Sequence, residues 1–275
     1  GNLFEDIGLN YIGPIDGHNI PLLVKTLKRM LEKNEPYILH VITKKGAGFE
    51  PAENERIKYH AISKIEKNPK KAKPKFQDIF GDWLCYKAKI DPNLVGITPA
   101  MKEGSGMVEF EQKFPDRFYD VAIAEQHSVT FGSGLFLGGL KPVVAIYSSF
   151  LQRAYDQFIH DVCLENLDVT FALDRAGVVG EDGPTHSGNF DLAFMRCVPN
   201  IIISTPSDEN ELWKLLNTSY HYKGPAAIRY PRGSGVGAKV SGKSDLLDVG
   251  KANKILDGSK TCILNFGVLL SRVIN

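Results

Sequence analysis

The segment Phe118-Tyr-Asp-Val-Ala-Ile-Ala-Glu125-Gln-His127 is the stretch that decides the fold of this sequence. An apolar, β-rich run ends at a carboxylate, and glycines at helical spacing follow it. Val121 and Ile123 predict a strand that is covered on both faces, as strands of parallel sheets are. Glutamate is rarely buried unless it is paired or functional. Glu125 is therefore a candidate site residue at the carboxyl edge of an α/β sheet, where ligands bind.

Four glycines follow this segment, at Gly132, Gly134, Gly138 and Gly139. A phosphate-binding loop needs its glycines at the turn directly after a strand, whereas these lie inside a helical stretch. We interpret them as positions of close helix packing, with a phosphate loop as the alternative.

From Phe76 onward, helical patterns alternate with short apolar runs. The runs lie at residues 94–97, 143–146, 169–173, 201–203 and 226–228. Such alternation predicts β-α units around a mostly parallel sheet flanked by helices, which is an α/β fold. We expect this domain to span residues 76–232.

A partial domain is expected before it, in residues 1–62. Apolar residues from Leu22 to Leu31 predict a helix, and residues 37–42 predict a strand. One α-β unit cannot bury both faces of its strand, so this piece is expected to complete a larger domain.

Two linkers and a second partial domain complete the chain. Residues 63–75 are rich in Lys and Pro and residues 233–243 in Gly and Ser, and both compositions predict linkers. Residues 244–275 predict the start of a third domain, with a strand beginning at 261–266.

Composition excludes several classes of protein. The 275 residues are 43% hydrophobic and 24% charged, which is enough to build a core. A net charge of +1 gives no case for a nucleic-acid partner, and no stretch of about 18 uncharged apolar residues predicts a membrane span. We expect a cytoplasmic protein, with a plastid or another organelle left open. Because the chain opens on Gly1 within a pattern, we expect the native N-terminus to lie upstream.

Four cysteines, Cys85, Cys163, Cys197 and Cys262, are far apart and form no C-x-x-C pair. This spacing argues against a structural zinc site and against a disulfide framework. It predicts buried free thiols.

Five motifs occur in a fixed order within the predicted domain. They are Ala124-Glu125-Gln126-His127, Tyr147-Ser-Ser-Phe150-Leu-Gln-Arg153, Asp174-Arg175-Ala-Gly177, Asp182-Gly-Pro-Thr-His186-x-Gly188 and Arg229-Tyr-Pro-Arg232-Gly. Together they resemble the pyrimidine-binding domain of transketolase-type thiamine diphosphate enzymes, and within that family the 1-deoxy-D-xylulose-5-phosphate synthases. Residues 11–18 and 43–46 also resemble that branch, so the resemblance covers nearly the whole chain.

The resemblance implies a transferase that condenses pyruvate with D-glyceraldehyde 3-phosphate to 1-deoxy-D-xylulose 5-phosphate and CO₂, for isoprenoid, thiamine and pyridoxal precursors. It implies thiamine diphosphate and Mg²⁺ as cofactors, a homodimer, and residues 1–62 as the C-terminal tail of a diphosphate-binding domain. The Gly-Asp-Gly segment and Asn that hold Mg²⁺ in this family do not occur here. We expect them in a missing N-terminal domain, and we expect this chain alone to be inactive.

Two alternatives stay open. A nearer relative, such as transketolase or the β-subunit of a 2-oxo acid dehydrogenase, would use the same glutamate. The second alternative is that the chain is a non-catalytic fragment that binds a partner subunit.

The resemblance also implies roles for single residues around the cofactor. Glu125 would hydrogen-bond the N1′ atom of the cofactor's aminopyrimidine, Phe150 would stack on that ring, and Lys45 would approach the diphosphate. His60 and His186 would move protons near the reacting carbonyl groups. The alternatives are a capping or ion-paired glutamate, a core phenylalanine and solvated lysine and histidine side chains.

Tyr147, Arg153 and Arg232 match the family's acceptor-site residues, and we add Arg175 to them. Guanidinium groups bind phosphate through a planar fork, so several that converge would suit a phosphorylated acceptor. The alternative for each arginine is a surface salt bridge. Asp182 would orient a substrate hydroxyl or a neighbouring arginine, or else form an Asx turn before a glycine.

Overall fold

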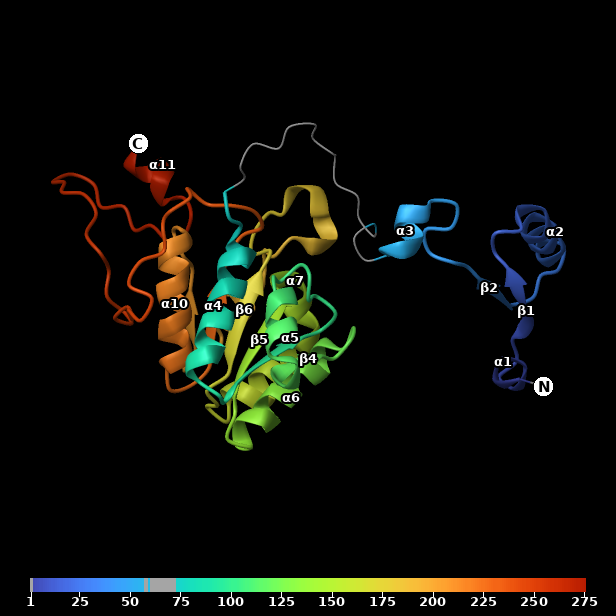
Figure 1. The fold of residues 1–275 in the computed structure, drawn as a ribbon, viewed down its shortest axis with the longest axis horizontal. Helices are drawn as coiled ribbons and strands as arrows, with labels where there is room; N and C mark the ends of the chain where they lie inside the picture. Colours follow the sequence, from blue (N-terminus) through green and yellow to red (C-terminus); the bar gives the residue numbers. More distant parts are fainter. Residues whose placement is uncertain (1, 57–58, 60–72) are drawn as a thin grey trace. The chain divides into compact units, whose positions relative to one another are not determined.

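The computed structural model describes residues 2–56, 59 and 73–275 (Figure 1). The chain divides into two compact units, Gly1–Lys70 and Lys71–Asn275, and each is described by itself. His60, one of the predicted catalytic residues, lies outside the described residues.

The first unit contains a β-α-β arrangement. Strands β1 (Asn10–Asp16) and β2 (Tyr37–Ile42) pair in parallel, and helix α2 (Ile20–Leu31) connects them. The predicted helix and following strand are confirmed, but the prediction of a single α-β unit is wrong, because β1 gives β2 a neighbour. Pro14 inside β1 concealed this strand, since proline cannot donate to a sheet ladder. The other helices here are α1 (Leu3–Asp6) and α3 (Glu50–Asn54).

In the described part of the second unit, six parallel strands form one sheet in the order β4-β3-β5-β6-β8-β7. Every residue of β3 and β6 is buried, as are the five middle residues of β5. The predicted α/β fold with a mostly parallel sheet is confirmed. The strands are β3 (Leu94–Thr98), β4 (Phe118–Asp120), β5 (Lys141–Tyr147), β6 (Thr170–Asp174), β7 (Ile202–Ser204) and β8 (Ala226–Arg229).

Helices cover both faces of this sheet (Figure 1). Val143 and Ala145 of β5 pack in one buried cluster with α4 and α10, whereas Val144 and Ile146 pack in another with α6. The long helices are α4 (Phe76–Ile90), α6 (Glu125–Leu137) and α10 (Glu209–His221). The shorter segments are α5 (Val108–Lys113), α7 (Ser148–Leu151), α8 (Tyr155–Gln157), α9 (Asp191–Met195), α11 (Leu270–Ile274), η1 (Pro115–Arg117), η2 (Gln152–Ala154), η3 (Phe158–Cys163), η4 (Gly180–Asp182) and η5 (Pro184–His186).

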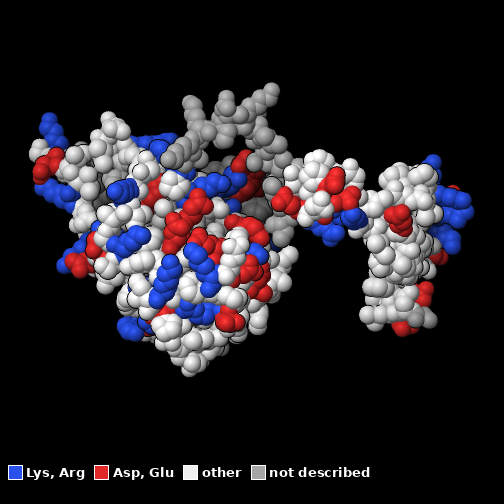
Figure 2. Space-filling model, viewed as in Figure 1, with Lys and Arg blue, Asp and Glu red and all other residues white. Residues whose placement is uncertain are grey.

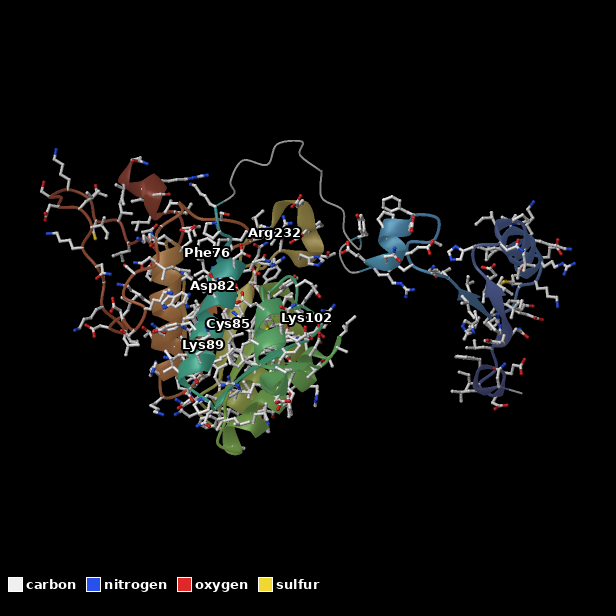
Figure 3. The ribbon with its side chains drawn as sticks, viewed as in Figure 1. Phe76, Asp82, Cys85, Lys89, Lys102 and Arg232 are labelled. Carbon is white, nitrogen blue, oxygen red and sulfur yellow. The ribbon has the colours of Figure 1, made fainter. Side chains whose placement is uncertain are left out.

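Helix α4 shows how one face of a helix builds the core. Phe76 and Cys85 are buried, while Lys89 lies on the solvent side (Figure 3). Trp83 is fully buried and donates from Nε1 to Asn217 Oδ1 of α10 at 2.9 Å, which satisfies its one polar atom. Acidic and basic side chains mix on the face of this unit that Figure 2 shows, so that face carries no field of a single sign.

Gly132 confirms the interpretation of close helix packing. A Cβ atom there would lie 3.3 Å from Val144 Cγ2 and 3.6 Å from Ile97 Cδ1, so α6 approaches the sheet closely at this point. At Gly134 an added Cβ would meet nothing within 4 Å, so the interpretation does not extend to that position.

Strand β4 is shorter than predicted. It ends at Asp120, whose Oδ1 atom accepts hydrogen bonds from the backbone N–H groups of Ala100 and Ala122, both at 2.9 Å. The predicted strand through Val121 and Ile123, covered on both faces, is therefore wrong, and Ile123 is 81% exposed. The aspartate side chain bonds the backbone in place of a sheet neighbour, and β4 is an edge strand.

Residues 244–275 differ from the expectation of a strand beginning at 261–266. In the structure residues 261–266 form no strand and have no sheet partner, helix α11 follows at the end of the segment, and Ile263, Leu264 and Phe266 are exposed. The prediction is wrong because a strand requires a neighbour for its backbone groups, and the described residues supply none here.

All four cysteines are free, as predicted. Cys85 and Cys163 are buried, but Cys197 and Cys262 are exposed, so the prediction of burial is wrong for those two. Cys197 follows the short helix α9, and Cys262 lies in the unpaired segment near the C-terminus.

Candidate active site

Polar residues gather at the carboxyl edge of the six-stranded sheet. Strand β5 ends at Tyr147 and β6 at Asp174, with Arg175 next in the chain. Because the strands are parallel, their carboxyl ends meet at one edge, which is where α/β proteins bind ligands.

Backbone strain also concentrates at this edge. Ala100, Ala122 and Arg175 have φ angles of 60°, 56° and 57°, and each lies within two residues of the end of a strand. Such a conformation costs a non-glycine residue about 1–3 kcal/mol and is typical of functional sites. The remaining non-glycine residue with positive φ in the described chain, Asn166, lies before β6, at the opposite edge.

Glu125 and Arg153 form an ion pair, with Arg153 Nη1 donating to Glu125 Oε1 at 2.8 Å. The glutamate side chain is 4% exposed and the arginine side chain 54% exposed. Glu125 is the first residue of α6, where a helix favours a negative charge. The guanidinium carbon of Arg153 lies 4.9 Å from the centre of the Phe150 ring. Arg153 therefore contacts both a buried carboxylate and an aromatic ring.

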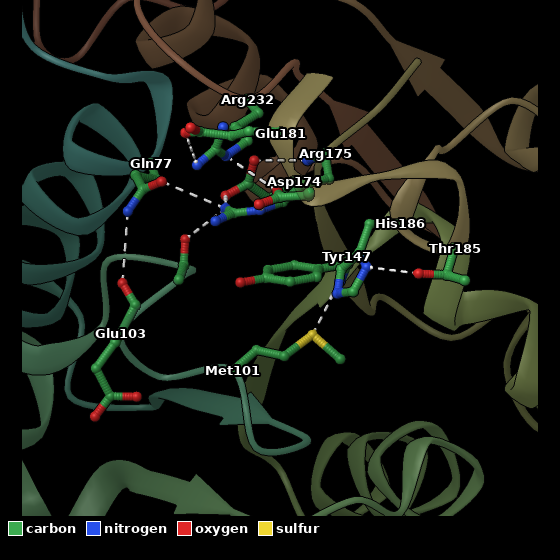
Figure 4. A network of polar contacts seen from close by, with 12 residues as sticks. Gln77, Met101, Glu103, Tyr147, Asp174, Arg175, Glu181, Thr185, His186 and Arg232 are labelled. Atoms are coloured by element: carbon green, nitrogen blue, oxygen red, sulfur yellow. Dashed lines mark hydrogen bonds and ion pairs between the residues drawn. The ribbon is translucent and has the colours of Figure 1, made fainter. Parts of the chain in front are cut away.

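Three rings continue from this pair. The Phe150 ring centre lies 5.6 Å from that of Tyr147, with 22° between their planes, and 5.1 Å from that of His186, edge to face. His186 Nδ1 is 3.1 Å from the Thr185 hydroxyl (Figure 4). These rings connect the Glu125 end of the site to a group of buried charges.

Arg175 is the centre of that group. It is 8% exposed, and its Nη1 atom contacts the Asp174 carboxylate, the carbonyl oxygen of Gly104 at 2.7 Å and Gln77 Oε1 at 3.3 Å (Figure 4). Its guanidinium carbon lies 4.2 Å from the centre of the Tyr147 ring. One side chain thereby ties α4, the loop after β3 and the ends of β5 and β6 together.

Arg232 pairs with two carboxylates. Its Nη2 atom lies 2.5 Å from Glu181 Oε1, and its Nε atom lies 3.0 Å from Asp182 Oδ2. The same Asp182 oxygen is 3.5 Å from Arg175 Nε. Asp182 therefore bridges two arginines.

Burial changes the acid-base properties of this group. It raises the pKa of Asp174 to about 6, against the opposing effect of the Arg175 guanidinium. Burial also raises the pKa of Tyr147, and it holds the pKa of the fully buried Tyr230 well above its ordinary value. The charge of Asp174 therefore changes in the pH range just below neutrality.

The structure brings most of the candidate residues into one chain of contacts. These are Glu125, Arg153, Phe150, Tyr147, His186, Arg175, Asp182 and Arg232. Arg153 contacts Glu125 and Phe150, and the structure records no contact between it and the group of Arg175 and Arg232. Lys45 is exposed and belongs to the first unit.

The sequence patterns assigned no role to several residues of this network, namely Gln77, Met101, Gly104, Asp174 and Glu181, although Asp174 belongs to one of the five motifs. Met101 Sδ accepts a hydrogen bond from the backbone N–H of Tyr147 at 3.2 Å. A Cβ atom on Gly104 would lie 1.7 Å from Tyr147 Oη, so the loop approaches that ring closely. Asp174 carries the signal that selected Glu125, a carboxylate at the end of an apolar run, and it is the last residue of β6.

The described residues hold neither a cluster of metal-binding side chains nor a membrane-spanning helix. They contain no group of three or more His, Cys, Asp or Glu side chains that could hold a metal ion. None of their helices has both the length and the apolar character needed to cross a bilayer.

Residues 72–236 match the family model of the transketolase pyrimidine-binding domain. The chain belongs to this family. Residues 1–43 match a second family model, that of 1-deoxy-D-xylulose-5-phosphate synthase. Curated proteins of that name are similar to the chain. The protein from Hahella chejuensis is 61% identical over 98% of this chain and 43% of its own length, and the one from Stutzerimonas stutzeri is 58% identical over 98% and 44%. The chain thus spans less than half the length of these relatives.

Solved transketolases share the fold. A split-gene transketolase, described as an inactive β4 tetramer, has a TM-score of 0.56 at 24% identity, covering 64% of this chain and 57% of that one. The transketolase from Campylobacter jejuni has a TM-score of 0.54 at 17% identity, covering 84% of this chain and 48% of its own. At these identities the likeness shows the fold alone.

Proposed function

We propose that the chain is part of a thiamine-diphosphate-dependent transferase that condenses pyruvate with D-glyceraldehyde 3-phosphate to 1-deoxy-D-xylulose 5-phosphate and CO₂, a step that feeds isoprenoid precursors. The supporting observation is the 61% identity with a curated synthase over 98% of the chain. The alternative of transketolase itself has weaker support, because the transketolase structures are 17–24% identical.

The residues present fit the pyrimidine end of thiamine diphosphate. Arg153 contacts both a buried carboxylate, Glu125, and an aromatic ring, Phe150. We propose that Glu125 hydrogen-bonds the pyrimidine nitrogen and that Phe150 stacks on the ring. When bound, thiamine diphosphate supplies the nucleophilic carbon for the carbonyl chemistry.

Mg²⁺ and the diphosphate site are a further part of the proposal. A diphosphate group needs a hard cation with oxygen ligands. Because the chain spans 43% of its relative from Hahella chejuensis, we propose that these ligands lie in the remainder of the full-length enzyme. Lys45, in the first unit, is proposed to approach the diphosphate.

We propose that the opposite end of the site binds the acceptor. Arg232 would hold the acceptor phosphate, and Arg175, fixed by its protein contacts, would add positive charge beside Tyr147. Asp182 would keep the two guanidinium groups in place. We keep Arg153 as a further phosphate contact that approaches from the Glu125 side.

Proton transfer at the carbonyl groups is proposed for two histidines. His186 lies edge to face with Phe150, so it would stand beside the cofactor ring. Histidine changes charge near neutral pH and therefore suits this role. His60 is proposed as the second histidine on the strength of the family motif.

A homodimer and a cytoplasmic location are proposals that rest on the family. The curated relatives named above come from bacteria, which have no plastids, so a plastid location has no support.

The test uses the full-length enzyme that contains this chain. With thiamine diphosphate, Mg²⁺, carboxyl-labelled pyruvate and D-glyceraldehyde 3-phosphate, we expect labelled CO₂ and 1-deoxy-D-xylulose 5-phosphate in equal amounts. Transfer of a two-carbon unit between sugar phosphates without release of CO₂ would instead identify a transketolase.

A further inference from the structure

The Glu181 carboxylate pairs with one N–H group of Arg232, the arginine to which we assign the acceptor phosphate. Its Oε1 atom lies 2.5 Å from Arg232 Nη2 (Figure 4), whereas Asp182 holds the Nε side of the same group. The Glu181 side chain is 72% exposed and that of Asp182 22% exposed. One carboxylate is therefore anchored in the site, and the other lies at its surface.

An ion pair whose carboxylate is this exposed is weak, and the Arg232 side chain is itself 30% exposed. The net contribution of such a pair corresponds to at most about a fivefold change in an equilibrium constant. Phosphate carries up to two negative charges and can bind a guanidinium group through two oxygens. A phosphate can therefore displace the Glu181 carboxylate, whereas an anion with a single carboxylate gains little by the exchange.

The backbone on both sides of Glu181 permits it to leave. Gly180 and Gly183 have φ angles of 62° and 80°, and a Cβ atom at either position would meet nothing within 4 Å. Glycine adopts positive and negative φ with similar ease, so the backbone at Gly180 can adjust as the Glu181 side chain leaves, while Asp182 keeps its contacts with the two arginines.

The net charge of the group also indicates that Glu181 must withdraw before phosphate binds. Three carboxylates, those of Asp174, Glu181 and Asp182, face the two guanidinium groups of Arg175 and Arg232. The group carries a formal charge of −1 when all are ionised, and a phosphate that enters beside Glu181 would meet an excess of negative charge. With Glu181 withdrawn, the group is neutral.

We propose that Glu181 is a specificity-determining residue of the acceptor site. Its carboxylate stands in for phosphate on Arg232 in the free protein, and an incoming phosphate group displaces it. This inference rests on the proposed function, in which Arg232 holds the acceptor phosphate. Glu181 weakens the binding of every anion at Arg232 by the cost of breaking this one pair, so a monoanion of low intrinsic affinity no longer binds while phosphate still does.

The test is a double-substitution cycle read by calorimetry. Inorganic phosphate, and separately acetate, is titrated into the full-length enzyme with thiamine diphosphate and Mg²⁺ already saturating. The four proteins are the unsubstituted enzyme, Glu181→Gln, Arg232→Ala and the double variant. Binding that is lost with Arg232→Ala is the binding at this site.

We expect Glu181→Gln to tighten the binding of phosphate and of acetate about three- to fivefold each, with phosphate remaining the more tightly bound anion. The double variant should bind phosphate no better than Arg232→Ala. Glu109→Gln is the matched control, because Glu109 is an exposed carboxylate paired with Lys113 on α5, and its loss changes the net charge equally. It should leave both titrations unchanged.

Unchanged or weaker phosphate binding in Glu181→Gln, together with loss of binding in Arg232→Ala, would overturn the role of Glu181 and leave the phosphate assignment of Arg232 intact. Phosphate binding that survives Arg232→Ala would instead overturn that assignment. If Glu109→Gln increased the affinity for phosphate as much as Glu181→Gln, the effect would arise from net charge alone, which would contradict the proposal.

Discussion

Arg175 Nη1 donates a hydrogen bond to the carbonyl oxygen of Gly104 at 2.7 Å. This contact ties the loop after β3 to the end of β6, although the two residues are 71 positions apart in the sequence. The Tyr147 ring packs against both residues, with the Arg175 guanidinium group over its face and its hydroxyl group at Gly104.

Gly104→Ala should disturb this arrangement. The added Cβ would lie 1.7 Å from Tyr147 Oη, so the ring or the loop must move. We expect the free energy of unfolding to fall by about 1–3 kcal/mol, the usual cost of overpacking. Gly134→Ala is the control, because its Cβ would meet nothing within 4 Å inside α6. It should leave stability unchanged or raise it by up to about 1 kcal/mol, as alanine does in a helix. Urea unfolding of both variants measures the difference, and equal effects would mean that Tyr147 adapts freely.

Asp174 should make stability depend on pH. Burial raises its pKa in the folded protein from 3.8 to about 6, so the folded state binds a proton that the unfolded state has released between these values. Its contribution to stability is fully present below about pH 4 and is lost as the pH rises through about 6, by about 2–3 kcal/mol in total.

Asp174→Asn removes that titration. The stability of the unsubstituted protein relative to Asp174→Asn should therefore fall between pH 4 and pH 6 and stay constant above pH 7. Urea unfolding at intervals of half a pH unit measures it. A difference that rises with pH in this range would show that the Arg175 pairing outweighs burial and lowers the pKa.

Arg232 should determine the preference for a phosphorylated acceptor. In the full-length enzyme, we expect Arg232→Ala to raise the KM for D-glyceraldehyde 3-phosphate about tenfold to a hundredfold, since a charge-assisted hydrogen bond contributes about 1.5–3 kcal/mol. The KM for pyruvate should change far less. The measurement is kcat/KM with phosphorylated and with unphosphorylated glyceraldehyde. Equal losses of kcat/KM for both acceptors would mean that Arg232 supports the fold or the binding of the cofactor instead.

The chain alone should not bind thiamine diphosphate tightly. We propose that the Mg²⁺ ligands lie in the remainder of the full-length enzyme, and without them the diphosphate lacks its counter-charge. Calorimetric titration of this polypeptide with thiamine diphosphate and Mg²⁺ should show no metal-dependent binding and no decarboxylation of pyruvate. Sub-micromolar, Mg²⁺-dependent binding would reveal a diphosphate site within these residues.

The central strands were predictable because parallel strands buried on both faces are continuous apolar runs. Strands β3, β5 and β6 follow that rule closely. Two of the errors arose where a polar side chain or a proline overrides the pattern. Asp120 ends β4 by bonding the backbone itself, although Val121 and Ile123 continue the apolar run. Pro14 lies inside β1 although it cannot donate to the ladder.

The site was predictable to the extent that its residues lie in local motifs. Glu125, Phe150 and Arg153 come from two such motifs, and the structure brings them into contact. The contacts of Arg175 with Gln77 and Gly104 join segments far apart in the sequence, and no local pattern encodes such a meeting. Loop positions of this kind depend on the tertiary structure.

The most direct test of the account is the exchange rate of the C2 proton of thiamine diphosphate bound to the full-length enzyme, followed by NMR in D₂O. If Glu125 activates the cofactor, Glu125→Ala should slow the exchange by about 10²–10⁴, the range typical of a positioned acid-base group. Arg153→Ala, which removes the partner of Glu125 and leaves its carboxyl group in place, should slow it less. An exchange rate in Glu125→Ala equal to that of the unsubstituted enzyme, with the cofactor still bound, would contradict the account.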